Sequence, residues 1–114
     1  ELSDAMLATG FACLRAGWRR NNLPIFCRVA PRVREIRRFG SAAIDLAYVA
    51  AGRLDGFWEL NLKPYDVAAG ALLVSEAGGR ITDLAGGRRW PQRGILATNG
   101  LIHHAMLACV KPGR

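Results

Sequence analysis

The sequence has few cysteines and no long apolar run. Its three cysteines, Cys13, Cys27 and Cys109, are widely spaced and odd in number, which argues against a disulfide framework and against a zinc site built from paired CxxC motifs. We therefore expect a reducing, cytoplasmic setting. Asp45 and Asp66 interrupt the apolar stretches before they reach membrane-spanning length, so neither a transmembrane helix nor a membrane partner is expected. No secretory signal is visible.

The composition is that of a folded globular domain. At 114 residues the chain suits a single domain, and 51% of its residues are hydrophobic, which favours a packed core over disorder. Repeats and low-complexity segments are absent, so residues 1–114 are expected to form one unit. The first residue is Glu1, and the residues after it read like the middle of a fold, which is what a fragment of a longer protein would show.

Positive charge is concentrated in two segments. The net charge is +7, and three arginines lie in residues 15–20 while five lie in residues 28–38. Such clusters can bind RNA or small anions, but no aromatic residues alternate with them as a stacking surface requires. A solvated basic helix face explains them equally well, so nucleic-acid binding is disfavoured and stays open.

Apolar spacing and turn residues predict alternating strands and helices, and hence a layered α/β arrangement. A helix over residues 23–36 should be split at Pro31, and a helix over residues 41–52 should be capped by Ser41 and ended by Gly52. The final helix should begin near Asn99. Short strands are expected at residues 5–11, 35–39, 54–60, 80–84 and 94–99.

A further helix is predicted from Pro64 to the Gly78-Gly79 pair. Apolar residues surround it almost completely, so we expect a buried helix. Asp66 lies in its first turn, where the helix dipole favours a negative charge, and the small residues Ala69 and Gly70 are expected to leave space beside its carboxylate. Such a carboxylate suits Mg²⁺, which takes one or two carboxylates together with water and phosphate oxygens. It equally suits a plain helix cap, and the spacing leaves both interpretations open.

Small residues also open the helix after residue 40. Gly40, Ser41, Ala42 and Ala43 would let an anion or a hydroxylated ligand approach the free backbone N–H groups closely, although they would equally allow tight helix packing. The apolar face of this helix is predicted at Ile44, Ala47, Tyr48 and Ala51. Glu59, at the end of a predicted strand, could face the same crevice or lie in solvent.

Together these segments resemble the inositol monophosphatase family. The segments that carry the resemblance are GSAA, LAYVAAGRLDG, a strand that contains a Glu, and a PYDVAAG segment that ends in EAGG. ATGF near the start and ILATN near the end extend the resemblance over essentially the whole chain. The resemblance implies the C-terminal part of an inositol monophosphatase/fructose-1,6-bisphosphatase-like sandwich, with a mixed sheet flanked by helices.

The resemblance also implies roles for individual residues. Asp66 matches a metal-binding aspartate that also approaches the substrate. Gly40, Ser41 and Ala42 match a segment that contacts the substrate, and Glu59 matches a ligand of a substrate hydroxyl. The family's Trp before the aspartate is replaced here by Tyr65, which keeps an aromatic wall with different packing.

Other family motifs do not occur in these residues. A GE-type glutamate and a DPxDGT segment, which supply most metal ligands and activate water in the family, are missing. Asp45, Asp55 and Asp83 do not reproduce their spacing, and Asp45 is expected to pair with an arginine such as Arg37 or Arg38. No catalytic residue beyond the metal ligand Asp66 is assigned.

The implied function is magnesium-dependent hydrolysis of a phosphate monoester such as inositol 1-phosphate, by a full-length protein that is expected to form a homodimer. This chain alone should be inactive. His103, His104 and the cysteines have no visible triad partner, and the histidines are expected to be structural. The alternative is an inactive binding or RNA-associated module that uses its arginines. The residues do not determine the exact substrate among phosphorylated alcohols.

Overall fold

We analysed a computed structural model, which describes residues 1–11, 17 and 21–111. Cys13 and the arginines of residues 15–20 lie outside the described residues. Cys27 is exposed and Cys109 is buried, and both are free thiols. None of the described helices is long and apolar enough to cross a membrane.

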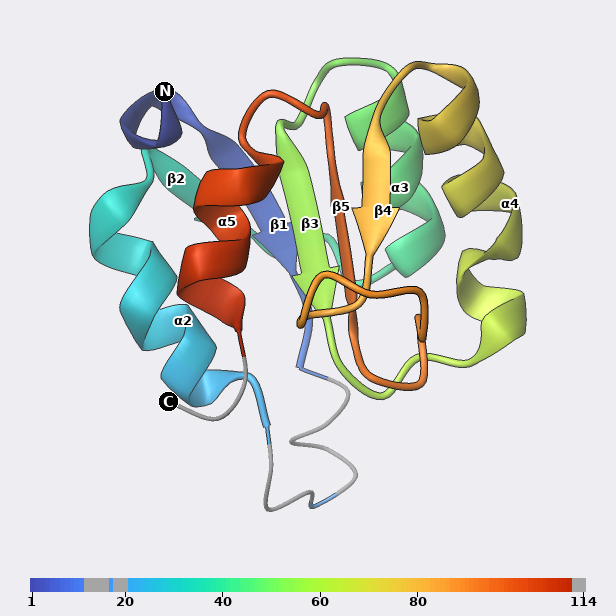
Figure 1. The fold of residues 1–114 in the computed structure, drawn as a ribbon, viewed down its shortest axis with the longest axis horizontal. Helices are drawn as coiled ribbons and strands as arrows, with labels where there is room; N and C mark the ends of the chain where they lie inside the picture. The colour runs from blue at the N-terminus through green and yellow to red at the C-terminus, as the bar shows by residue number, and fades with distance from the viewer. Residues whose placement is uncertain (12–16, 18–20, 112–114) are drawn as a thin grey trace.

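The described residues form a mixed five-stranded sheet with helices on both faces (Figure 1). The strand order is β2-β1-β3-β5-β4; β1 pairs in parallel with β2 and β3, whereas β5 runs antiparallel to β3 and β4. This arrangement confirms the predicted α/β class. The bounds are β1 Met6–Thr9, β2 Glu35–Arg37, β3 Gly56–Glu59, β4 Arg80–Thr82, β5 Ile95–Thr98, α2 Leu23–Val29, α3 Ala42–Ala50, α4 Pro64–Glu76 and α5 His103–Val110, with short 3-10 helices at Leu2–Asp4 and Ala30–Arg32.

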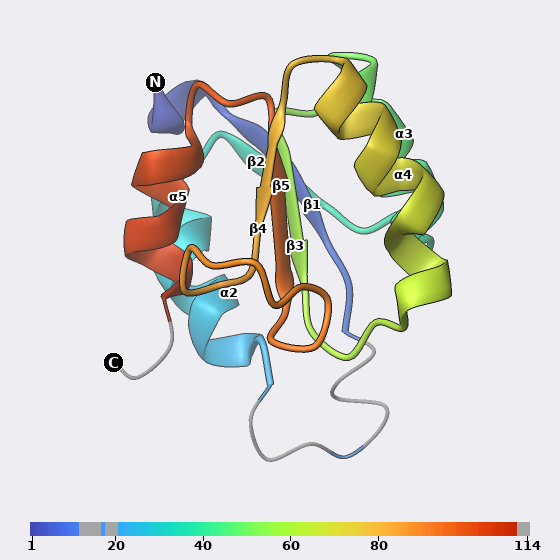
Figure 2. The same cartoon turned by 45° about the vertical axis from the view of Figure 1, so that its right-hand side comes forward.

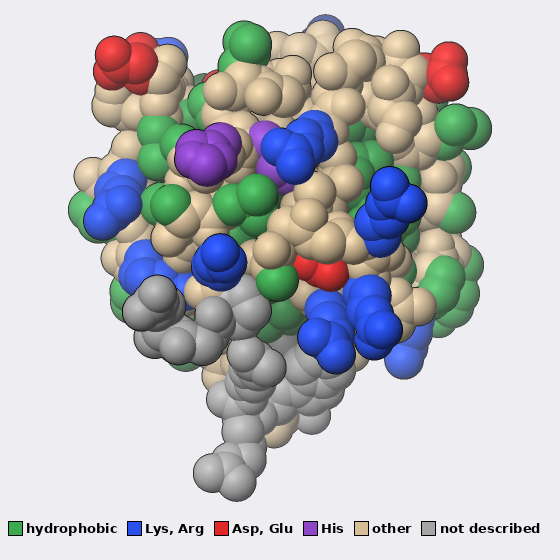
Figure 3. Space-filling view, viewed as in Figure 1, with side chains coloured by type: hydrophobic (Ala, Val, Ile, Leu, Met, Phe, Trp, Pro, Cys, Tyr) green, Lys and Arg blue, Asp and Glu red, His purple; other side chains and the backbone are tan. Residues whose placement is uncertain are grey.

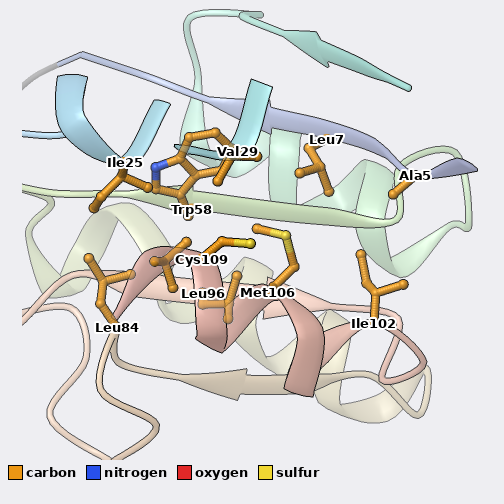
Figure 4. Close-up of a cluster of buried hydrophobic side chains, with 11 residues drawn as sticks. Ala5, Leu7, Ile25, Val29, Trp58, Leu84, Leu96, Ile102, Met106 and Cys109 are labelled. Carbon is orange, nitrogen blue, oxygen red and sulfur yellow. The ribbon is translucent and has the colours of Figure 1, made fainter. Parts of the chain in front are cut away.

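Two helix pairs cover the two faces of the sheet. Helices α2 and α5 pack against each other on one face, and α3 and α4 pack against each other on the other (Figure 2). Side chains of adjacent β3 residues point to opposite faces. Trp58 therefore joins the core beneath α2 and α5, together with Met106 and Leu96 (Figure 4), while Phe57 joins the core beneath α3 and α4.

Local signals set most element ends. Helix α2 ends at Val29 and continues as a 3-10 helix through Pro31, as the proline predicts. The Ser41 hydroxyl accepts a hydrogen bond from the Ile44 N–H at 3.3 Å and caps α3. The last helix, predicted over residues 101–110 with its start near Asn99, begins only at His103. The Asn99 side chain accepts from the Leu101 N–H at 2.9 Å, and this turn delays the start of α5 until His103.

The predicted faces of α3 and α4 were also wrong. On α3 the sheet buries Asp45, Leu46 and Val49, whereas Ile44 is 46% exposed. Helix α4 is amphipathic rather than buried all round, because only the side with Val67, Gly70, Ala71 and Val74 is covered. Its other side exposes three large apolar side chains, Tyr65, Leu72 and Leu73.

Gly70 explains which side of α4 is covered. A Cβ atom at this position would lie 2.5 Å from the Cβ of Leu46, so the missing side chain lets α4 approach α3 closely. The prediction that Gly70 opens space beside Asp66 was therefore wrong, since Gly70 contacts α3 instead. Alanine-rich helices leave the covered face undetermined by sequence, and this close contact decides it.

Candidate functional site

The topology creates a crevice between the carboxyl ends of β1 and β3. The chain leaves β1 toward β2 through α2 on one face, and leaves β3 toward β4 through α4 on the other. Connections that depart in opposite directions leave a gap at the strand ends, which is where open α/β sheets bind ligands. The N-terminal ends of α3 and α4 lie at this same end of the sheet (Figure 1).

A pocket of about 460 Å³ occupies this crevice. That volume suits a small molecule. Residues from five segments line it: the end of β1, the loop after β2, the first turn of α3, the end of β3 with its loop, and the first turn of α4. They are Thr9, Gly10, Arg38, Gly40, Ser41, Ala42, Ala43, Asp45, Glu59, Asn61, Leu62, Tyr65 and Asp66.

All five residues proposed from sequence line this one pocket. Gly40 and Ser41 lead into α3, and Ala42 is its first residue. Gly40 has φ +83°, a conformation that glycine adopts without strain. Because the side chains here are small, the free N–H groups at the start of α3 are accessible to a ligand. The structure thus brings Gly40–Ala42, Glu59 and Asp66 together, and their roles remain predictions.

The surroundings of Asp66 show the helix cap and leave its role as a metal ligand a prediction. One oxygen of its carboxylate, Oδ2, accepts a hydrogen bond from the Lys63 N–H at 2.9 Å and so caps α4. The side chain is half-buried and also lines the pocket. A helix cap therefore fixes the direction of the carboxylate, while the pocket gives a ligand access to it. Tyr65 lines the same pocket and is 81% exposed, so the expected aromatic wall stands at the rim.

Glu59 is held against the backbone of Gly10. Only 6% of Glu59 is exposed, and a Cβ atom on Gly10 would lie 2.5 Å from its Oε2 atom. Glycine at this position is therefore what allows the carboxylate to occupy the end of the crevice. Gly10 is itself held by Asn22, whose side-chain amide donates to the Gly10 carbonyl at 2.5 Å. The prediction that Glu59 faces the crevice of Asp66 agrees with this geometry.

Asp45 is the main correction to the sequence analysis. The expected pairing with Arg37 or Arg38 was wrong, because Arg37 pairs with Glu35 at 2.8 Å and Asp45 forms no salt bridge within the described part of the chain. Asp45 instead lines the pocket with only 1% of its surface exposed. Burial, together with the negative charge of Glu59, raises the pKa of Asp45 to about 7.

The other two aspartates are structural, which agrees with leaving them out of the site. Asp55 accepts from the Met6 N–H at 2.8 Å and from the Asn99 amide at 3.2 Å, at the opposite end of β1. Asp83 accepts backbone N–H groups of Ala85, Gly87 and Arg89 at 2.8 to 3.1 Å and so closes a loop. Burial would raise the pKa of Asp83, but these hydrogen bonds hold it below its usual value.

The pocket can supply part of a metal site. Within residues 1–11, 17 and 21–111, no three His, Cys, Asp or Glu side chains come together as a metal-binding group. Asp66 fits a Mg²⁺ ion as a single carboxylate ligand, since the ion commonly takes one or two carboxylates and completes its shell with water and phosphate oxygens. The described residues therefore fit one edge of a metal centre.

Sequence reasoning missed several residues of the pocket. Arg38 is exposed and brings a positive charge to the rim, and Asn61 adopts a left-handed φ of 64° in the loop after β3. Thr9 donates its hydroxyl to the Trp58 carbonyl at 2.7 Å and joins the ends of β1 and β3. The position of Thr9-Gly10 at the end of a buried strand was a usable signal. The sequence indicated Arg38 only as one member of the basic segment 28–38, and nothing in it indicated Asn61.

Fold and pocket together define a class of protein. It is an α/β protein in which carboxylates, a cationic side chain and free helix N–H groups converge at the carboxyl ends of parallel strands, a combination suited to a small, polar, charged ligand.

Comparison with known proteins gives the family. The family model described as "Inositol monophosphatase family" matches residues 1–111, and the chain belongs to this family. It is 46% identical over 112 residues to an inositol-1-monophosphatase of Mesorhizobium japonicum, covering 97% of this chain and 42% of that protein. It is also 46% identical over 109 residues to the Nus factor SuhB of Escherichia coli K12, covering 95% of this chain and 41% of the relative.

Solved structures agree with the fold. The structure of an inositol monophosphatase from Anabaena superposes with a TM-score of 0.89 at 44% identity, covering 96% of this chain and 44% of that one. The chain therefore spans about two fifths of the length of the relatives that it matches. The resemblance inferred from the GSAA, LDG and PYDVAAG segments is confirmed.

Proposed function

We propose that the protein carrying this chain hydrolyses phosphate monoesters of small polyols with the help of Mg²⁺. The observation that carries the proposal is the convergence of the Gly40–Ala42 turn, Glu59 and Asp66 on a single pocket at the strand ends. Membership of the inositol monophosphatase family supports it. Inositol 1-phosphate is the proposed substrate.

The residues of the pocket have separate proposed roles in metal binding and in orienting the substrate. Asp66, with its direction set by the Lys63 N–H, would hold one metal ion at the start of α4. Bound Mg²⁺ supplies charge that polarises phosphoryl oxygens and lowers the pKa of a coordinated water. Glu59 and the free N–H groups of α3 orient the alcohol half of the ester, which limits the motion of the reacting group. The pocket walls, including Tyr65, reduce access of bulk water.

A substitution of Asp66 tests the proposal. The full open reading frame that encodes this chain is expressed with Asp66→Asn, and phosphate release from inositol 1-phosphate is measured with and without Mg²⁺. We expect the unaltered protein to need Mg²⁺ and the variant to lose at least about 100-fold in kcat/KM, because a metal ligand is missing. Asn can still accept from the Lys63 N–H, so the melting temperature should change little.

A matched control uses the other end of the same helix. Glu76 is an exposed carboxylate in the last turn of α4, outside the pocket. Glu76→Gln should leave both activity and Mg²⁺ affinity unchanged, whereas Asp66→Asn should weaken Mg²⁺ binding in a calorimetric titration. A folded, unaltered protein that releases no phosphate from inositol 1-phosphate or from a wider panel of phosphate monoesters would contradict the proposal.

A binding module that uses basic residues is the second candidate. The net charge of +7 favours it, and Figure 3 shows Lys and Arg side chains spread over one face of the molecule with few acidic groups between them. Exposed basic residues in the part of the chain that the structure describes include Arg32, Arg80, Arg88, Arg89 and Arg93. Salt-sensitive binding to an RNA of mixed sequence, together with the absence of phosphatase activity, would favour this candidate.

A further inference from the structure

The pocket contains a second buried carboxyl group for which the proposed reaction has no role. Asp45 is 1% exposed and Glu59 is 6% exposed, and both line the pocket. Within the described residues, the Oδ1 atom of Asp45 is buried and has no hydrogen-bond partner. A buried polar atom without a partner costs about 1–3 kcal/mol, so its presence calls for an explanation.

Structural roles do not account for Asp45. Ser41 already caps α3 through its hydroxyl, and Asp45 forms no salt bridge with described residues. Leu46 and Val49, which are buried beside it on α3, show that an apolar side chain would suit the covered side of this helix. Replacing a buried carboxyl that has one oxygen without a partner by an apolar group of similar size is expected to be nearly neutral or stabilising. The group therefore serves a purpose other than stability.

Two neighbouring buried carboxyls provide complementary hydrogen-bonding groups. The charge of Glu59 disfavours ionisation of Asp45, and the pKa of Asp45 is raised to about 7. While Asp45 holds a proton, the pair offers one O–H donor and several acceptor oxygens. Adjacent hydroxyl groups of a polyol each need a donor and an acceptor, which is what this pair presents. The soft χ2 torsion of Asp lets its oxygens exchange places, so a hydroxyl in the pocket can give either oxygen a partner.

We propose that Asp45 and Glu59 form a two-carboxyl subsite that recognises adjacent hydroxyl groups on the alcohol half of the substrate, with Asp45 as the residue that determines specificity. The inference rests on the proposed function, because it assigns the selectivity of the same pocket. Arg38 at the rim and Asp66 at the start of α4 are the other charged side chains that line the pocket. If Arg38 and a metal ion on Asp66 bind the charged phosphate half, Asp45 and Glu59 are left for the uncharged, hydroxylated part of a ligand.

Two substrates that share a six-membered carbon ring but differ in their hydroxyl groups test whether Asp45 recognises those hydroxyls. Inositol 1-phosphate carries hydroxyls around the ring, and cyclohexyl phosphate carries none. In the full-length protein, Asp45→Leu should lower kcat/KM for inositol 1-phosphate by at least about tenfold and leave kcat/KM for cyclohexyl phosphate within about twofold, because only one substrate has hydroxyls to lose. Asp45→Asn keeps a donor and an acceptor and should restore most of the preference for inositol 1-phosphate.

Asp83→Asn is the control for a purely structural effect. Asp83 is also a buried carboxylate, 3% exposed, but it binds loop amides outside the pocket. This variant should lower the melting temperature and keep the ratio of the two kcat/KM values. If Asp45→Leu lowers kcat/KM for both substrates by the same factor, or lowers neither value, the inference is overturned while the phosphatase function stands.

Binding of the dephosphorylated alcohol, myo-inositol, tests the subsite independently of the proposed phosphatase function. Saturation-transfer NMR with myo-inositol, and with cyclohexanol as the comparison, needs no phosphatase activity. We expect a myo-inositol signal with the unaltered protein and with Asp45→Asn, and loss of that signal with Asp45→Leu. If the protein hydrolyses neither phosphate ester, the proposed function fails and this titration alone decides the subsite. Absence of myo-inositol binding to the unaltered protein would overturn it.

Discussion

Gly10 shows how a single missing side chain shapes the pocket. The Glu59 carboxylate occupies the volume where a Cβ atom of residue 10 would lie, with Oε2 only 2.5 Å from that position. The first methyl group added at residue 10 would therefore displace Glu59 from the end of the crevice. The surrounding core would change little, because the group that moves is at the tip of a side chain.

We predict that Gly10→Ala impairs substrate binding more than folding. A displacement of Glu59 by about 1 Å should raise KM for inositol 1-phosphate by roughly 10- to 100-fold in the full-length protein. The free energy of unfolding should fall by no more than about 1–3 kcal/mol, the usual cost of adding a methyl group to a packed region. Steady-state kinetics and urea denaturation measure the two effects. An unchanged KM would show that Glu59 does not orient the substrate.

At the scale of elements, His103 joins β4, β5 and α5. Its Nε2 atom lies 2.9 Å from the Thr82 hydroxyl and its Nδ1 atom 2.9 Å from the Thr98 hydroxyl. Because the Thr82 hydroxyl donates its one proton to the Asp83 carbonyl, it must accept from Nε2–H, and the Thr98 hydroxyl then donates to Nδ1. A neutral imidazole satisfies both contacts. Burial, and then the charge of Arg80, lowers the pKa of His103 to about 4.

This contact predicts a loss of stability in mild acid. Between pH 6.5 and 4 the unfolded chain binds a proton at residue 103 and the folded chain does not, so the free energy of unfolding falls as the pH drops through this range. The two pKa values differ enough to account for at most about 3 kcal/mol. His103→Gln should flatten this part of the pH profile, measured by urea denaturation at pH 7 and pH 5.

The neighbouring histidine is the control. His104 lies next to His103 on α5 but is exposed. His104→Gln should keep the full pH dependence of the unaltered protein. Equal slopes for the two variants would mean that acid sensitivity arises elsewhere in the molecule. The expectation that both histidines are structural holds for the described contacts of His103, which lies outside the pocket.

On the scale of the whole molecule, helices α3 and α4 expose four large apolar side chains. Ile44, Tyr65, Leu72 and Leu73 are 46%, 81%, 62% and 50% exposed. Within the part of the chain that the structure describes, no three His, Cys, Asp or Glu side chains come together as a metal-binding group. The relatives are more than twice as long as the part that this chain matches.

We predict that the 114-residue chain produced alone has no measurable phosphatase activity. Phosphate release from inositol 1-phosphate should stay at the level of a buffer blank at millimolar Mg²⁺, and size-exclusion chromatography should show self-association through the exposed apolar side chains. The full reading frame serves as the positive control. Robust Mg²⁺-dependent turnover by the isolated chain would show that these residues suffice for the chemistry.

Much of the fold could be predicted because its signals are local. Pro31 ends α2, Ser41 caps α3, and Pro64 opens α4, since each acts through its own backbone or its nearest neighbours. The Asp66 cap is also local, because its partner is the Lys63 N–H only three residues away. The buried faces of α3 and α4 could not be predicted, because their many alanines make several stripes equally apolar. Leu46 is buried and Ile44 is exposed only because Gly70 brings α4 against that side of α3.

The sequence by itself determined the approximate positions of most helices and strands, the family, and five of the residues that line the pocket, because those features depend on short-range chemistry and on recognisable segments. Only the tertiary structure decided that Asp45 joins Glu59. The two residues come from different elements, and their proximity follows from how α3 packs on the sheet. The same packing buries Asp45 without a salt bridge to any arginine that the structure describes and raises its pKa, an outcome that no spacing along the chain could reveal.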